Sequence, residues 1–240
     1  DWGGANLALT MTTEGVLSGS KTFVGCGHEA SLILVVGQCD NAPAIAVVDA
    51  ADLKAGAISV NTLIDLTKRT AQIDFTGVAA KAVLTGEHVV AAIRDYRLLG
   101  ALLTAAEAAG SAARCLAVIV DYLKTRKQFG KLIGSYQALK HPTVDIYCGV
   151  EDARSFCYHA ASLLDADSLS HDAEIACRMA KVSAGQTMSY AGDRAVQFHG
   201  GIGFTWDCDS TLFIRRGQWS HQVFGDAIHH RKRLASLLLD

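Results

Sequence analysis

The spacing of apolar residues changes near residue 88, and this change limits the possible folds more than any other feature of the chain. Before it, short segments such as 7–12 alternate apolar and polar residues and are separated by glycine, asparagine and aspartate. Such alternation is typical of strands with one buried face. After it, long segments rich in alanine and leucine carry apolar residues three and four positions apart, as amphipathic helices do. We therefore predict an α+β fold, with an antiparallel β-barrel or sandwich domain over 1–88 and an antiparallel four-helix-type bundle over 89–240.

Several segments fit this two-part plan. The sequences "SLILVVG" (31–37), "AIAVVDA" (44–50) and "TAQIDF" (70–75) are expected strands, and a further strand segment is expected at 17–24. Helices are predicted at 91–127, 135–165, 171–198, 207–220 and 222–238. Pro142 lies inside the second and is expected to start or kink a helix, because proline has no amide hydrogen to donate. A β layer of this size needs a second layer on its other face, so we expect the β domain to be incomplete at its N-terminus.

Charge, hydropathy and cysteine usage argue against several classes of function. The formal net charge is −2 and basic residues gather only locally, around 215–216 and 229–233, which disfavours a nucleic-acid-binding face. No apolar run approaches the ~18 residues of a membrane span, so we predict a cytoplasmic protein without such a span. The seven cysteines are scattered and form no CxxC pair, which disfavours a disulfide framework or a zinc ribbon.

Three histidines and an aspartate lie close together in "SHQVFGDAIHH" (220–230). His229 and His230 are adjacent, so they point in different directions from a helix, and a turn separates them from His221. Neither pair has the i, i+4 spacing that places two ligands on one metal ion. We predict no metal site.

Two stretches carry residues suited to a phosphate-bearing ligand. In "RKQFGKLIGSYQ" (126–137), an arginine offers a fixed cation for a pyrophosphate, although a cation at a helix C-terminus is common without any ligand. In "QFHGGIGFTWD" (197–207), three glycines end one helix and leave backbone amides approachable, although a plain helix–helix turn needs the same residues. Next to these glycines, His199 is expected to orient the loop.

Together these stretches are more specific than either alone. "DYLKTRKQFGKLIGSYQALKH" followed by "AVQFHGGIGFTWDCDSTLFIRR" closely resembles the C-terminal domain of the acyl-CoA dehydrogenase family, and "LSGSKTFV" looks like the start of that family's central β domain. The resemblance implies FAD as the cofactor. It implies that Arg126 reaches the FAD pyrophosphate of a neighbouring subunit, with Phe129 beside it and Gln128 and Gln137 completing the pocket.

The same resemblance assigns the other side of the cofactor. It implies that Gln197, Gly200 and Gly201 contact the adenosine part, and the pairing of these residues with the arginine across subunits implies at least a dimer. In the β domain, Phe23 and Val24 would lie against the flavin ring. The family usually has a threonine at the next position to hydrogen-bond the flavin, where this chain has Gly25. The family's N-terminal helical domain has no counterpart in this sequence.

The catalytic carboxylate of the family has no counterpart at either of its known positions. In most members a glutamate in a Tyr-Glu-Gly stretch removes the α proton of the acyl-CoA, and desolvation raises its pKa toward the working pH. Counting from the glycines places that glutamate at Phe224, in "VFGD". A second group of members carries the base on the first long helix, at the position of Gly100.

Two acidic residues are candidate substitutes for the missing base. Glu107 lies seven residues after Gly100, on the same side of the helix, and is either a displaced base or the partner of a nearby arginine, with the ion pair the more common case. Asp226 lies beside the usual base position and is either a base or the N-terminal cap of the last helix, with the cap the more common case.

Three functions are compatible with the resemblance. The first is an FAD-dependent acyl-CoA dehydrogenase that oxidises an acyl-CoA thioester and passes electrons to an electron-transferring flavoprotein. The second is a non-catalytic subunit that completes the FAD site of a heteromeric enzyme of α2β2 composition, while another chain holds the base. The third is a flavin monooxygenase on the same fold. A homo- or hetero-oligomer, as a dimer of dimers, is expected.

Overall fold

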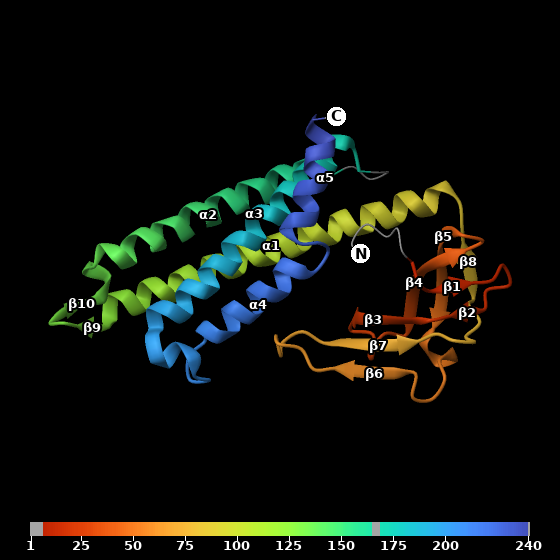
Figure 1. The fold of residues 1–240 in the computed structure, drawn as a ribbon, viewed down its shortest axis with the longest axis horizontal. Coiled ribbons are helices and arrows are strands. Elements are labelled where there is room, and N and C mark those ends of the chain that lie inside the picture. The colour runs from red at the N-terminus through yellow and green to blue at the C-terminus, as the bar shows by residue number, and fades with distance from the viewer. Residues whose placement is uncertain (1–6, 165–168, 240) are drawn as a thin grey trace. The chain divides into compact units, whose positions relative to one another are not determined.

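The structure, a computed structural model, describes residues 7–164 and 169–239. The chain forms two compact units, Asp1–Tyr96 and Arg97–Asp240. The first is built mainly of strands and the second of helices (Figure 1), which confirms the α+β class. Helix α1 (Glu87–Thr125) contributes residues to both units. The predicted domain boundary between residues 88 and 89 remains a prediction.

The strand unit contains two sheets. The five-stranded sheet has the order β2-β1-β4-β5-β8 and the three-stranded sheet the order β3-β7-β6 (Figure 1). The strands are β1 (Thr10–Met11), β2 (Leu17–Ser18), β3 (Ser20–Gly25), β4 (Leu32–Cys39), β5 (Ala42–Asp49), β6 (Ile58–Asn61), β7 (Thr70–Asp74) and β8 (Ala82–Leu84). Residues of both sheets, among them Val35 and Ile73, belong to one buried apolar cluster, as in a β-sandwich.

Two details of the sheets differ from the prediction. The segment 17–24 is not one strand, because Gly19, with a φ of 120°, separates β2 in one sheet from β3 in the other. The five-stranded sheet is also not wholly antiparallel, since β1 pairs in parallel with β4 where Thr10 lies opposite Gln38. The pairing of two strands this distant in sequence leaves no local signal. The alternation of apolar and polar residues therefore could not reveal whether the two strands are parallel or antiparallel.

The helices of the second unit lie close to their predicted ranges. They are α1, α2 (Gln137–Ser162), α3 (His171–His199), α4 (Ser210–Gln222) and α5 (Ala227–Leu239), with a short 3-10 helix η3 (Gly200–Phe204) after α3. Helix α3 packs against α2, α4 and α5. Pro142 does not start α2, which begins five residues earlier, and instead lies inside its second turn.

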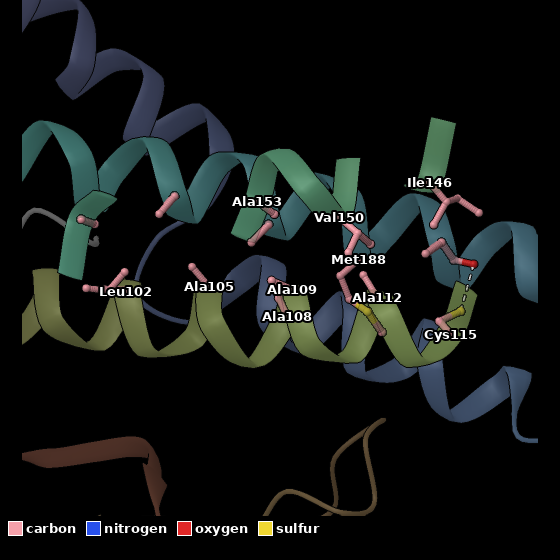
Figure 2. Close-up of a cluster of buried hydrophobic side chains, with 14 of the residues drawn as sticks. Leu102, Ala105, Ala108, Ala109, Ala112, Cys115, Ile146, Val150, Ala153 and Met188 are labelled. Carbon is pink, nitrogen blue, oxygen red and sulfur yellow. Dashed lines mark hydrogen bonds between the residues drawn. The ribbon is translucent and has the colours of Figure 1, made fainter. Parts of the chain in front are cut away.

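The core of the bundle is built largely of small residues. Figure 2 shows Ala105, Ala108 and Ala112 of α1 in the same buried cluster as Val150 of α2 and Met188 of α3. The Cys115 thiol of α1 donates a hydrogen bond to the Ala191 carbonyl of α3, with 3.4 Å between sulfur and oxygen (Figure 2). Small side chains let helix backbones approach closely, so this core fixes the helices that carry the candidate site.

The expectation of no membrane-length apolar segment is wrong for α1. By length and composition this helix could cross a membrane, with a mean hydropathy of 1.4 over its most apolar 18 residues, of which 39% are buried. Its side chains at Leu98, Leu102 and Ile119 are buried in the bundle cluster. A core helix meets the same criteria, and we interpret α1 as the core helix of this bundle.

Candidate functional site

The first candidate element is a hairpin after α1, residues 126–132, which we call the arginine hairpin. Its strands β9 (Lys127–Gln128) and β10 (Lys131–Leu132) pair antiparallel and lie at one end of the bundle (Figure 1). The two turn residues, Phe129 and Gly130, have φ angles of 51° and 78°, as a tight two-residue turn requires. The turn leaves the Phe129 side chain 92% exposed. The hairpin therefore presents its side chains away from the core.

The side chains expected to bind the cofactor's pyrophosphate are free to do so. Arg126, Gln128 and Gln137 are exposed, and within residues 7–164 and 169–239 none of the three side chains has a hydrogen-bond or ion-pair partner. An unpaired guanidinium offers a fork of donors that matches phosphate oxygens. These residues thus fit a pyrophosphate, and their role in binding FAD remains a prediction.

The second candidate element is the glycine turn, residues 197–203, at the end of α3. The His199 ring stacks on the Tyr122 ring of α1, with 4.1 Å between ring centroids, and its Nδ1 lies 2.7 Å from the Ala195 carbonyl oxygen. The stacking ties the end of α3 to the end of α1, a few residues before the arginine hairpin. The two motifs that the sequence resemblance combined therefore lie at the same end of the bundle, and the role of His199 in orienting the loop remains a prediction.

The glycines of this turn serve different purposes. A Cβ atom on Gly203 would lie 2.5 Å from the Val196 carbonyl oxygen, so this glycine is needed for packing. Around Gly200 and Gly201 no heavy atom would lie within 4 Å of an added Cβ atom. Their backbone faces open space, and the Gln197 side chain beside them is exposed. The turn can therefore admit a flat ligand group such as an adenine.

The two expected base positions meet in the structure. A Cβ atom added to Gly100 would lie 2.4 to 2.6 Å from three atoms of the Phe224 ring. The phenylalanine thus fills the space beside the glycine, and neither position carries a carboxylate. Phe224 has a φ of 59° and the following Gly225 a φ of 107°, so the short connection between α4 and α5 contains two consecutive left-handed residues.

Both substitute carboxylates have structural partners. Glu107 of α1 forms an ion pair with Arg216 of α4, and their side chains are 35% and 23% exposed. The Oδ1 atom of Asp226 accepts a hydrogen bond of 2.7 Å from the backbone N–H of His229, in the first turn of α5. These contacts match the ion-pair and cap interpretations, and a catalytic role for either residue remains a prediction.

Sequence reasoning missed a buried polar network under the turn 223–226. His230 of α5, 2% exposed, has its Nε2 atom 3.0 Å from the Phe224 carbonyl oxygen and its Nδ1 atom 3.3 Å from Nη1 of Arg178. Arg178 in turn donates to the Glu174 carboxylate from Nε (2.9 Å) and Nη2 (2.5 Å). Burial and the neighbouring Arg178 charge lower the pKa of His230 to about 3. The histidine is therefore neutral near pH 7.

A second buried cation lies beside this network. Lys181 of α3 is 3% exposed and its Nζ donates to the carbonyl oxygens of Ser220 (2.7 Å) and His221 (3.2 Å) at the C-terminal end of α4. Burial lowers its pKa to about 8. One sequence signal could have identified these two buried cations. Arg178 and Lys181 are the only charged residues in the otherwise small and apolar segment "IACRMAKVSA" of α3.

In the strand unit, Phe23 and Val24 lie at a bulge. The register of β3 against β7 shifts between Lys21 and Val24, and Phe23 has a φ of 55° and a side chain that is 64% exposed. Bulges re-aim side chains, so this one explains how an apolar side chain is presented outward. A Cβ atom on Gly25 would meet no heavy atom within 4 Å. The flavin contact of these residues remains a prediction.

Among the described residues, no group of three histidine, cysteine, aspartate or glutamate side chains could hold a metal ion.

Comparison with known proteins gives the following matches. The family model described as "Acyl-CoA dehydrogenase, C-terminal domain" matches residues 92–235. The acyl-CoA dehydrogenase IpdE2 of Mycolicibacterium smegmatis is 40% identical over 134 residues, which cover 56% of this chain and 40% of that protein. Acyl-CoA dehydrogenase FadE12 of Mycobacterium tuberculosis is 32% identical over 206 residues, covering 80% of this chain and 52% of the relative. This chain thus spans about half or less of the length of these relatives.

Solved structures extend the similarity over nearly the whole chain. The ChsE4-ChsE5 complex from Mycobacterium tuberculosis matches with a TM-score of 0.83 and 25% identity, over 98% of this chain and 63% of the matched one. Butyryl-CoA dehydrogenase from Megasphaera elsdenii matches with a TM-score of 0.88 and 21% identity, over 100% of this chain and 65% of that structure. The second match shows a shared fold only.

Proposed function

Since this chain belongs to the acyl-CoA dehydrogenase family, we propose that it takes part in the FAD-dependent α,β-dehydrogenation of an acyl-CoA thioester. We further propose that it does so as a subunit that completes an FAD site while a partner chain supplies the catalytic carboxylate. The observation that carries the proposal is that the two expected base positions meet without a carboxylate, the Phe224 ring filling the space beside Gly100. Removal of an α proton from a thioester requires a positioned base.

The cofactor-binding part of the site supports the same division of roles. FAD, when bound, accepts the hydride that leaves the β carbon of the substrate. The Arg126 guanidinium would neutralise the pyrophosphate, while the Gln197 amide and the backbone at Gly200 and Gly201 would hold the adenosine part. All these groups are exposed or open in this chain. A chain that retains the cofactor contacts and lacks the base is suited to a shared site.

Two-chain relatives also support a heteromeric assembly. The ChsE4-ChsE5 complex contains two different chains, and a steroid acyl-CoA dehydrogenase described as Tcur3481-Tcur3483 matches this chain with a TM-score of 0.83 and 25% identity. By analogy we propose an assembly of two different chains. On the family resemblance we further propose a dimer of dimers in the cytoplasm, with an electron-transferring flavoprotein as the acceptor.

The proposal is tested by purification from the native host without a tag on any partner. We expect a second family member that carries the glutamate to co-purify, and the yellow complex to bleach when a suitable acyl-CoA is added. Substitution of that glutamate by glutamine should abolish bleaching and leave the flavin bound. A homo-oligomer of this chain that bleaches by itself would overturn the proposed division of roles.

A second candidate function is a dehydrogenase that uses its own displaced base. It is favoured by the partial exposure of the Glu107 side chain, which is 35% exposed in spite of its ion pair. In that case Glu107→Gln or Asp226→Asn would abolish bleaching of the homo-oligomer. The flavin monooxygenase alternative is separated from both by oxygen consumption with reduced flavin and no acyl-CoA.

A further inference from the structure

The connection between α4 and α5 has an unusual backbone conformation that requires stabilising contacts. Phe224 is a bulky residue with a φ of 59°, a region that such residues rarely occupy, and Gly225 follows it at 107°. Such backbone persists only where surrounding contacts over-determine it. The local contacts are the Gly225 N–H to the Gln222 carbonyl oxygen at 3.2 Å and the cap formed by Asp226.

A long-range hydrogen bond to this turn comes from His230. Its Nδ1 atom lies beside an Arg178 N–H, which can only donate, so Nδ1 accepts and the ring proton is on Nε2. The Nε2–H therefore donates to the Phe224 carbonyl oxygen, 3.0 Å away. The hydrogen bonds form a continuous chain in which every donor meets an acceptor. Arg178 donates to the Glu174 carboxylate and to His230, and His230 donates to the turn. The imidazole thus links α3 to the turn in one defined tautomer.

This network lies outside the proposed chemistry and is costly to bury. Arg178 and His230 are 7% and 2% exposed, so neither side chain is open to substrate or cofactor. Removing one partner of a buried charged pair is strongly destabilising because it leaves an uncompensated charge, so the members of such a network are held together in one arrangement. The geometry specified here is that of the backbone at Phe224, whose ring covers Gly100.

We propose that Arg178 and His230 are positioning residues that hold the backbone of Phe224 so that its ring closes the space beside Gly100. This inference rests on the proposed function in one respect, which is that positions 100 and 224 are taken as the family's base positions. In that setting the two residues keep the base position of this chain closed, and the acyl group must find its base on the partner chain.

The inference is tested by using Gly100→Ala as a probe of the Phe224 ring. With the ring held in place, the added methyl group clashes with it, and the thermal midpoint of the full chain should fall by several degrees. In a His230→Leu background, which frees the Phe224 carbonyl, we expect the fall to shrink to less than half. In a His230→Gln background the amide can accept from Arg178 and donate to Phe224, so the full fall should return. Lys232→Leu, at an exposed position of the same helix, should leave the fall unchanged.

An equal fall in all four backgrounds would show that His230 does not position the ring. Should His230→Leu not fold, nitrogen NMR of the unsubstituted chain decides the matter, because the proposal requires a neutral His230 with its proton on Nε2 at pH 7. The opposite tautomer or an imidazolium would overturn it. These measurements need neither flavin nor acyl-CoA, so a failure of the proposed function would not change them.

Discussion

The ring of Phe224 occupies the space where a side chain on Gly100 would begin, although 123 intervening residues separate the two positions in the chain. Neither position carries a carboxylate, and these are the two positions at which the resemblance places the family's base. Any change at one of the two positions must therefore be considered together with the other.

The first prediction concerns this pair. Gly100→Ala alone should destabilise the chain by about 1–3 kcal/mol, because the methyl group overpacks against the ring. In a Phe224→Ala background the same change should stabilise it by up to about 1 kcal/mol, since alanine is the better helix former. Denaturant unfolding of the two single variants and the double variant measures the coupling. Additive effects would show that the ring does not fill this space in solution.

The second prediction concerns the ion pair between Glu107 and Arg216. Both side chains are partly exposed, so Glu107→Gln should cost no more than about 1 kcal/mol of the free energy of unfolding. Arg216→Gln should cost a similar amount, and the double variant little more. A double-mutant cycle checks this coupling. Loss of substrate-dependent flavin bleaching in Glu107→Gln, with stability unchanged, would instead identify a base.

The third prediction separates the two interpretations of Asp226. Asp226→Ala removes the acceptor of the His229 N–H and should cost about 0.5–2 kcal/mol of stability, as the loss of a helix cap does. Asp226→Asn keeps an acceptor at the cap and removes the acid. Its stability and the activity of the complex should both stay close to those of the unsubstituted protein. A stable but inactive Asp226→Asn variant would contradict the cap interpretation.

The fourth prediction concerns the open position beside Phe23 and Val24. Because an added Cβ atom on Gly25 would meet no heavy atom within 4 Å, Gly25→Thr should fold normally. Its hydroxyl would restore the flavin hydrogen bond usual in the family, and a net gain of about 0.5–1.5 kcal/mol corresponds to several-fold tighter FAD binding. Flavin titration of the assembled protein measures it. Gly25→Val has a similar shape without the hydroxyl, and equal tightening by both variants would exclude the hydrogen bond as the cause.

The fifth prediction concerns the buried Lys181. Its pKa is lowered to about 8 in the folded chain, while an unfolded lysine titrates near pH 10.4. Between these values the unfolded state binds more protons, so this residue makes the free energy of unfolding rise with pH, by roughly 3 kcal/mol in all. Buried cysteines oppose this trend in every variant. The free energy of unfolding of the unsubstituted chain minus that of Lys181→Met should therefore increase as the pH rises from about 8 to 10. The same difference taken with Lys232→Met, at an exposed site, should show no such change.

The helices were predictable from sequence because a 3.6-residue period sustained over many turns is a strong signal. All five lie within five residues of the expected ranges, with the largest difference at the start of α5, where the turn that carries Phe224 was expected to be helical. The parallel pairing of Thr10 with Gln38 was not predictable, because the relative direction of two strands depends on contacts between residues that are distant in the sequence. For the same reason the sequence identified Phe224 and Gly100 separately but could not show that they touch. The bond between Arg178 and His230, 52 residues apart, gave no pattern at all.

The arginine hairpin has a consequence for how the cofactor is retained. Its cation and its almost fully exposed Phe129 project from the bundle, and on the proposed function they contact an FAD molecule held largely by a neighbouring subunit. Flavin binding and subunit association are then thermodynamically linked, so each strengthens the other to the same extent. Flavin content should depend on protein concentration, with dilution below the dissociation constant of the assembly releasing FAD and added FAD driving reassembly.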